Sequence, residues 1–357
     1  MKGKLSLIAF SLMLAAPSHA QLFKIKVVDY GGLSGAPQAL IDAFEAELAK
    51  AQADINKDLP SAAPNRLMEG MANSSVIAGK GIGSDYASGM QVAIIGAGVG
   101  VGADLEKDKE SKSDLSGAGI QGGLMIGFNL GFLDAEKILG LDTNRLNVYF
   151  NGIAYNHEQK LGKNDKDTVE ADLKSFGVHF SYDWVKGNGS KLFGWGGIKL
   201  HTGYEYNKSS YTFTSSINET VNVSNSGQTI SGTITGRPRA QIDVTTHSIP
   251  VEISSSVQFL YLLSLYGGLG ADFNFGEAKG SGALNADPTT LNYSGGGGDP
   301  VVQADANIDG TGKVTGVWAR AFAGVQVNLP FTRIFVQADK PFGNDIVGAT
   351  AGVRFVY

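Results

Sequence analysis

The chain of 357 residues contains 49 glycines, 10 prolines and no cysteine. Without cysteine it can form no disulfide, no cysteine-ligated metal site and no catalytic thiolate. Its formal net charge of −5 gives no electrostatic reason to expect nucleic acid as a partner, which would need a clustered basic surface.

Residues 1–20 are predicted to form a cleavable secretory signal. Lys2 and Lys4 precede an apolar run over residues 5–16, and Ser18 and Ala20 supply the small residues that a signal peptidase needs. The run is too short for a membrane-spanning helix, which needs roughly 20 residues. No later apolar run reaches that length, so an exported chain of this kind would enter a membrane as a closed β-barrel.

Residues 21–88 are predicted to be a separate N-terminal region with one amphipathic helix over residues 37–57. We expect this region to be a periplasmic cap or a plug in the lumen of a barrel. An interfacial helix on the inner leaflet is a rival interpretation, although its polar face is acidic where such helices favour Lys and Arg. A disordered tether is a third.

Residues 92–105 look at first like a dinucleotide-binding fingerprint, because an apolar strand leads into closely spaced glycines. The charged run over residues 103–114 has no apolar face, however, so no helix follows to receive a phosphate. The glycines instead occupy even positions and the apolar residues odd ones. This pattern indicates a β-strand with one apolar face and one nearly bare face.

The same alternation recurs along the rest of the chain and predicts an all-β fold. Many of the strands are longer than the 5 to 6 residues typical of a soluble sandwich, and roughly 9 to 11 residues suffice to cross a membrane. Residues 89–357 are therefore predicted to form a transmembrane antiparallel up-and-down β-barrel. About ten strands are expected, at 93–105, 118–132, 146–151, 175–184, 198–206, 248–259, 263–275, 317–328, 332–340 and 346–357. No turn residue marks the join at 259–264, so the strand boundary there is open.

The last strand alternates apolar residues up to the terminal aromatic Tyr357, which resembles the closing strand of Gram-negative outer-membrane β-barrels. The resemblance does not identify a family within that class. It implies an outer-membrane location, contact with outer-membrane lipid and engagement of the barrel-assembly machinery through the C-terminal strand.

Connection lengths predict which end of the barrel faces outward. Short turns at 187–190 and 330–331, and a longer link at 133–144, fall at one end, whereas long polar loops near 225–227 and at 280–312 fall at the other. Because outer-membrane barrels have short periplasmic turns and long outer loops, we expect the long loops to be exposed on the cell surface.

Two sets of residues are predicted to face the lumen. The first is a wall of glycines, which either relieves crowding and curvature or receives another piece of the protein: Gly96, Gly98, Gly100, Gly102, Gly119, Gly123, Gly127, Gly131, Gly348 and Gly352. The second is a charged and polar lining of internal ion pairs, or of a narrow aqueous path: Asp183, Lys199, His201, Glu205, Glu252, Asp272, Arg320, Arg333 and Arg354.

No motif predicts catalysis. His179 and His201 are expected to point inward on neighbouring strands, but no convergent third ligand can be identified, so no metal site, cofactor or catalytic residue is predicted. Ten-stranded outer-membrane proteases use Asp and His residues at the outer rim, yet the spacing of such residues here identifies no comparable site.

Two functions remain in view. The first is a surface-exposed binding or adhesion scaffold, with the barrel as anchor and an extracellular ligand at the long outer loops. The alternative is a narrow or gated channel for small solutes, lined by the lumenal charges.

Overall fold

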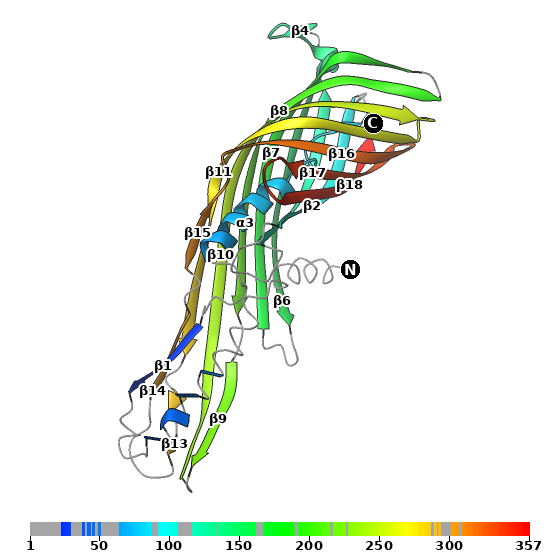
Figure 1. Ribbon diagram of the computed structural model, residues 1–357. Coiled ribbons are helices and arrows are strands. Elements are labelled where there is room, and N and C mark those ends of the chain that lie inside the picture. The colour runs from blue at the N-terminus through cyan, green and yellow to red at the C-terminus, as the bar shows by residue number, and fades with distance from the viewer. Residues whose placement is uncertain are drawn as a thin grey trace.

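In the computed structural model, a ring of antiparallel strands encloses a helix (Figure 1). The structure describes residues 23–29, short pieces between 38 and 50, 64–87, 92–105, 116–133, 135–161, 167–189, 192–214, 217–225, 228–286, short strands between 289 and 306, and 309–357. Within these residues, no helix is both long enough and apolar enough to span a bilayer.

Ten strands close the ring, each paired with its neighbours in the chain. They are β2 (Ala93–Asp104), β3 (Gly117–Asn129), β6 (Leu146–Leu161), β7 (Asp167–Gly189), β8 (Phe193–Thr214), β10 (Gln228–Phe259), β11 (Leu263–Ala286), β16 (Val317–Leu329), β17 (Thr332–Pro341) and β18 (Ile346–Val356). The ring closes where β18 pairs with β2. The predicted up-and-down antiparallel barrel is confirmed.

Side-chain alternation explains why these segments form the ring. Along β16, Trp318, Arg320 and Phe322 are buried inside, while Val317 and Val325 lie exposed on the outer face. The outer faces of the other strands are similarly apolar, as a lipid environment requires. The inner faces carry polar and charged residues together with glycines.

The two ends of the ring differ. At one end, here called the turn end, β2 begins and β18 finishes next to Tyr357. At the other, here called the loop end, four strands continue far beyond the length needed to cross a membrane: β7 has 23 residues, β8 has 22, β11 has 24 and β10 has 32. Figure 1 shows these strands extending away from the C-terminus.

The extension at the loop end carries additional short strands. β9 (Ile217–Asn225) forms a hairpin with β10, β13 (Asn292–Tyr293) pairs with β10, and β15 (Gly310–Lys313) pairs with β11. A separate three-stranded sheet has the order β1 (Phe23–Asp29), β14 (Val301–Ala306), β12 (Thr289–Thr290). The start of the described chain is therefore hydrogen-bonded to a loop-end strand.

The link between β3 and β6 lies at the turn end. It contains the 3₁₀ turns η2 (Leu130–Phe132) and η3 (Thr143–Arg145) on either side of the two-residue strands β4 (Lys137–Ile138) and β5 (Leu141–Asp142). The open boundary near residue 260 is a tight turn in which the Leu262 amide donates to the Phe259 carbonyl oxygen at 3.0 Å. Leu260 and Tyr261 both have positive φ, 52° and 57°, the sign that a type I′ hairpin requires.

The N-terminal region contains a helix that the sequence did not predict. Of the predicted helix at 37–57, only short helical pieces between 38 and 50 belong to the described residues, and the rest lies outside them. The helix that contacts the barrel is instead α3 (Pro64–Ala78). Figure 1 shows α3 within the curve of the sheet.

Candidate functional site

Helix α3 lies inside the loop end of the ring with 11 of its 15 residues buried. Pro64 suits its first turn because proline has a fixed φ and no amide donor. Leu67, Met68 and Met71 favour helix formation and pack in an apolar cluster with Val244 and Trp318 of the barrel wall. This cluster resembles the core of a soluble domain more than the lining of an open pore.

The opposite side of α3 approaches the glycine wall at backbone distance. A Cβ added to Gly102 would overlap the Ser74 carbonyl oxygen, and one added to Gly100 would overlap that of Ala78. Gly119 lies in the same way against the Ser75 amide. At these positions glycine is required because the helix backbone occupies the space of a side chain.

Six further glycines of the wall divide into two groups. Gly98 and Gly123 face Ile82, and Gly348 faces Ile77, so they also adjoin the inserted segment. The others make room for side chains of neighbouring strands: Gly96 for Met125 and Arg354, Gly127 for Tyr149, and Gly352 for Phe335. Here the relief of crowding accounts for the glycine.

The structure corrects the position of Gly131. It does not belong to the wall, because β3 ends at Asn129 and Gly131 lies in the 3₁₀ turn that follows. Its amide donates to the Asn129 Oδ1 atom at 2.9 Å. In the sequence, the alternation of apolar residues continues past Asn129 and so does not mark the end of β3. The hydrogen bond from the Gly131 amide to the Asn129 side chain does.

Beyond α3, residues 79–87 continue through the ring and carry two charged side chains. Lys80 is 1% exposed, and its Nζ atom lies 2.7 Å from Glu205 Oε2 and 3.1 Å from Asp272 Oδ1. It also donates to Ser248 Oγ at 2.9 Å. Thr350 Oγ1 donates to the Lys80 carbonyl oxygen at 2.6 Å, so both the backbone and the side chain of Lys80 are held by the wall.

Asp85, which is 0% exposed, is the second charged residue of the segment. Its carboxylate lies 2.6 Å from Arg333 Nη1 and 3.5 Å from Arg354 Nη1. Arg354 Nη2 also donates to the carbonyl oxygens of Gly81 and Ser84. Two of the three predicted lumenal arginines are therefore bound to the inserted segment.

Arg320 instead joins acids of the barrel wall. Its guanidinium binds Asp272 at 2.7 Å and Asp339 at 2.6 Å and also contacts Glu252. Because Asp272 also faces Lys80, one buried network links the strands and the inserted segment. Buried charges are tolerated when paired in this way.

The other predicted lining residues also lie inside the ring. Lys199 Nζ is 3.9 Å from Asp183 Oδ1. His201 Nε2 is 2.9 Å from Ser254 Oγ, and its ring packs against Tyr86 at 4.7 Å. His179 Nε2 lies 3.1 Å from Asn151 Oδ1. Each histidine thus has its own polar partner, and among the described residues no group of three His, Cys, Asp or Glu side chains could hold a metal.

Sequence reasoning missed Lys80, Asp85 and Asp339 as members of this network. Lys80 and Asp85 follow a helix that the sequence did not predict, in a stretch with no regular period. One signal was available in the sequence: Lys80 and Asp85 are the two charged residues of a short stretch that contains Gly79, Gly81 and Gly83. Glycines allow a segment to approach a wall closely.

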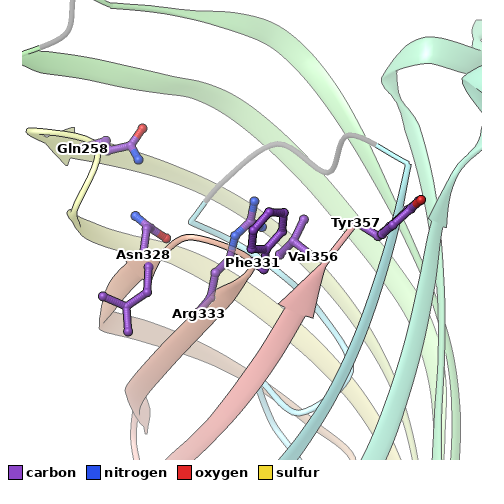
Figure 2. Close-up of a pocket in the computed structure, with 7 residues that line it drawn as sticks. Gln258, Asn328, Phe331, Arg333, Val356 and Tyr357 are labelled. Atoms are coloured by element: carbon purple, nitrogen blue, oxygen red, sulfur yellow. The ribbon is translucent and has the colours of Figure 1, made fainter.

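A shallow cavity of about 390 Å³ opens at the turn end, beside Arg333 (Figure 2). It is lined by Gln258, Asn328, Leu329, Phe331, Arg333, Val356 and Tyr357. Phe331 is 78% exposed, and Arg333 is already bound to Asp85. The cavity therefore lies at the turn end of the ring, next to the ion pair between Arg333 and Asp85 of the inserted segment.

The closed ring and its apolar outer surface define an outer-membrane β-barrel protein. More particularly, the chain belongs to the Lsa36-like family, whose model matches residues 19–357.

Solved structures with similar folds are outer-membrane barrels. The transport unit of the autotransporter AIDA-I from Escherichia coli shares 12% identity, covering 79% of this chain and 96% of that one, with a TM-score of 0.34. Ail, the attachment invasion locus protein of Yersinia pestis, shares 12% over 75% of this chain and 100% of that one, with a TM-score of 0.24. A major outer membrane protein from Thermus thermophilus shares 12% over 75% and 100%, with a TM-score of 0.29. At these scores nothing about function follows from the resemblance, and no curated protein matches the chain.

Proposed function

We propose that this protein is a surface-exposed binding or adhesion scaffold, anchored by a barrel whose lumen is filled. The observation that carries the proposal is the course of residues 64–87, which occupy the ring with backbone contacts at the glycine wall and buried ion pairs on Lys80 and Asp85. A filled lumen leaves the loop end as the part of the molecule available for recognition.

The outer faces of the strands support a boundary between membrane and extension. Near the loop end, Tyr204, Phe273 and Phe275 are exposed aromatics, as expected at a membrane interface. Further along the same strands the exposed residues become charged, including Lys208 and Lys279. Charges on a lipid-facing surface are unfavourable, so the strands leave the membrane near these aromatics.

The extension beyond that boundary is large. His247 of β10 pairs with Phe275, so the 19 residues of β10 before it lie beyond the boundary. At about 3.4 Å per residue they measure roughly 65 Å, about twice the thickness of the hydrocarbon core. Binding residues usually lie on loops supported by a rigid scaffold, and β9 and β13, which both pair with β10, have that support.

The experiment shortens the extension at a defined register. Ile217 pairs with Gly236, so residues 218–235 can be replaced by an Asn-Gly turn without changing the pairing below. We expect bacteria producing this variant to lose attachment to the surface that the intact protein binds, among immobilised glycans, immobilised proteins and cultured cells. Heat-modifiable gel migration should still report a folded barrel.

A matched control shortens a different loop-end hairpin. Leu161 pairs with Asp167, and replacing residues 162–166 by the same turn should leave attachment unchanged. If the 218–235 variant folds and binds as well as the intact protein, and a variant replacing residues 288–308 does too, the scaffold proposal is wrong.

The channel alternative requires the inserted segment to move. The lumenal charges on which it was based are paired with one another or with Lys80 and Asp85, so a conducting state would have to break several buried ion pairs. The binding proposal needs no such change.

A further inference from the structure

We propose that the chain threads its own barrel, so that residues 64–87 pass through the lumen from the loop end to the turn end and the upstream strand β1 is displayed on the loop side. The inference rests on the membrane orientation of the proposed function, in which β1 would lie on the cell surface. The barrel would then carry a displayed N-terminal segment in addition to its loops.

Contacts along strand β2 establish the direction of the segment. Arg66 Nη2 donates to both carboxylate oxygens of Asp104 at 2.9 Å, at the loop end of β2. Ser74 then lies at Gly102, Ala78 at Gly100 and Ile82 at Gly98. Each step along the segment thus moves toward the turn end.

The two ends of the segment lie at opposite ends of the ring. At the start, Asn65 Oδ1 accepts the Thr311 amide at 2.9 Å, and Pro64 lies against Gly310 of β15. At the finish, Ser256 Oγ donates to the Ala87 carbonyl oxygen at 2.9 Å, and Ser256 is close to the turn-end terminus of β10. Strand β2 then begins at the turn end and returns toward the loop end as part of the wall.

A second, independent observation concerns the region upstream of α3. Strand β1 pairs with β14 over Phe23↔Ala306 to Asp29↔Val301. β14 belongs to the loop between β11 and β16, which projects from the loop end. Figure 1 shows β1 and β14 side by side, at the end of the molecule away from the C-terminus. A periplasmic cap would place β1 at the other end.

The absence of cysteine from the sequence allows single cysteines to report sidedness. Ser34→Cys tests the upstream region, Ser294→Cys marks the loop between β11 and β16, and Ser190→Cys marks the turn between β7 and β8. Intact cells producing each variant would be treated with a membrane-impermeant maleimide, and again after the outer membrane is permeabilised.

We expect the S34C variant to label in intact cells to within about twofold of S294C, whereas S190C labels only after permeabilisation. Labelling of S34C only together with S190C, in protein that shows folded-barrel gel migration, would overturn the threading. If S34C and S294C both label only after permeabilisation while S190C labels in intact cells, threading stands but the surface-scaffold proposal fails. The two proposals are therefore distinguishable.

Discussion

Gly102 shows at the scale of one residue how the wall and the inserted segment depend on each other. A side chain there would overlap the Ser74 carbonyl oxygen and Ile77, whereas its neighbour Val101 is 41% exposed on the outer face. The two residues are consecutive in β2 but lie on opposite faces of the sheet. They form a natural test pair.

We expect Gly102→Leu to destabilise the barrel by about 1–3 kcal/mol, because the added side chain must displace the backbone of α3. Val101→Leu on the same strand should change stability by less than about 1 kcal/mol, since it faces outward. Urea unfolding of protein refolded into lipid vesicles measures both. Equal stability of the two variants would mean that α3 does not press on the wall.

Asp85 provides the corresponding test for charge. Removing one partner of a buried ion pair typically costs about 3–5 kcal/mol, because the other charge stays buried. We expect Asp85→Asn to lower the stability of the folded barrel by much of that amount, since Arg333 and Arg354 remain inside the ring. The same unfolding assay applies.

The control for Asp85 is an exposed pair on β7. Asp172 lies 2.9 Å from Lys174, with both side chains more than one third exposed, and such pairs contribute about 0.2–1 kcal/mol. Asp172→Asn should therefore have little effect. A loss as large as that of Asp85→Asn would show that the buried network has no special role.

The face of the sheet on which each strand side chain lies was predictable, because apolar and polar residues alternate along the strands. Arg320 and Asp272 were expected to face inward for this reason; in the structure both are buried and bind each other. The partners of Arg333 and Arg354 were not predictable, because Asp85 follows an irregular stretch with no period that ties it to the barrel.

At the scale of elements, the turn at Leu260 and Tyr261 is one that the sequence does not predict. Two-residue hairpins with positive φ at both central positions usually carry Asn-Gly. Here Leu and Tyr adopt that backbone, so the usual signal is missing. Both side chains are more than half exposed at the turn end, where an apolar and an aromatic residue suit the membrane interface.

Replacing Leu260 and Tyr261 by Asn and Gly should relieve backbone strain of about 1–2 kcal/mol per residue. The matched variant Leu260→Ala with Tyr261→Ala loses the same apolar groups but keeps the strain. We therefore expect the Asn-Gly variant to be the more stable of the two by at least about 1 kcal/mol in urea. Indistinguishable midpoints would mean that the turn is not strained.

Helix α3 was missed for a different physical reason. Its faces carry Gly70, Ser74 and Ser75 as well as Met and Leu, so it lacks the single apolar stripe by which an amphipathic helix is identified. Small residues are needed because one side contacts glycine backbone, while the other packs in the apolar cluster. Only the folded wall supplies both environments.

At the scale of the whole molecule, the ring could be predicted from alternation and strand length, but the threading could not. The direction of residues 64–87 depends on contacts such as Arg66 with Asp104 and Asp85 with Arg333, which join positions far apart in the sequence. The pairing of β1 with β14 also spans almost the whole chain.

A disulfide can test the position of the inserted segment in the folded protein. A Cβ at Gly98 would lie 3.6 Å from Ile82 Cγ2 and 3.7 Å from Ile82 Cγ1, which are positions that the sulfur of a cysteine at residue 82 can take. The two residues therefore adjoin closely, as a disulfide between them requires. We expect the I82C, G98C double variant to cross-link on oxidation, with reversal by reductant. A control pairing I82C with V99C, whose side chain faces outward, should not cross-link, and equal yields in the two variants would contradict this placement.

The most direct test of the filled lumen is electrical conductance in a planar bilayer. Protein spanning residues 21–357 would be compared with a variant that lacks residues 21–88. We predict that the longer protein is silent and that the shortened barrel conducts, since removal of Lys80, Asp85 and α3 leaves polar walls facing an unfilled lumen. Steady currents of equal amplitude from both proteins would contradict the account, because the inserted segment would then not close the barrel.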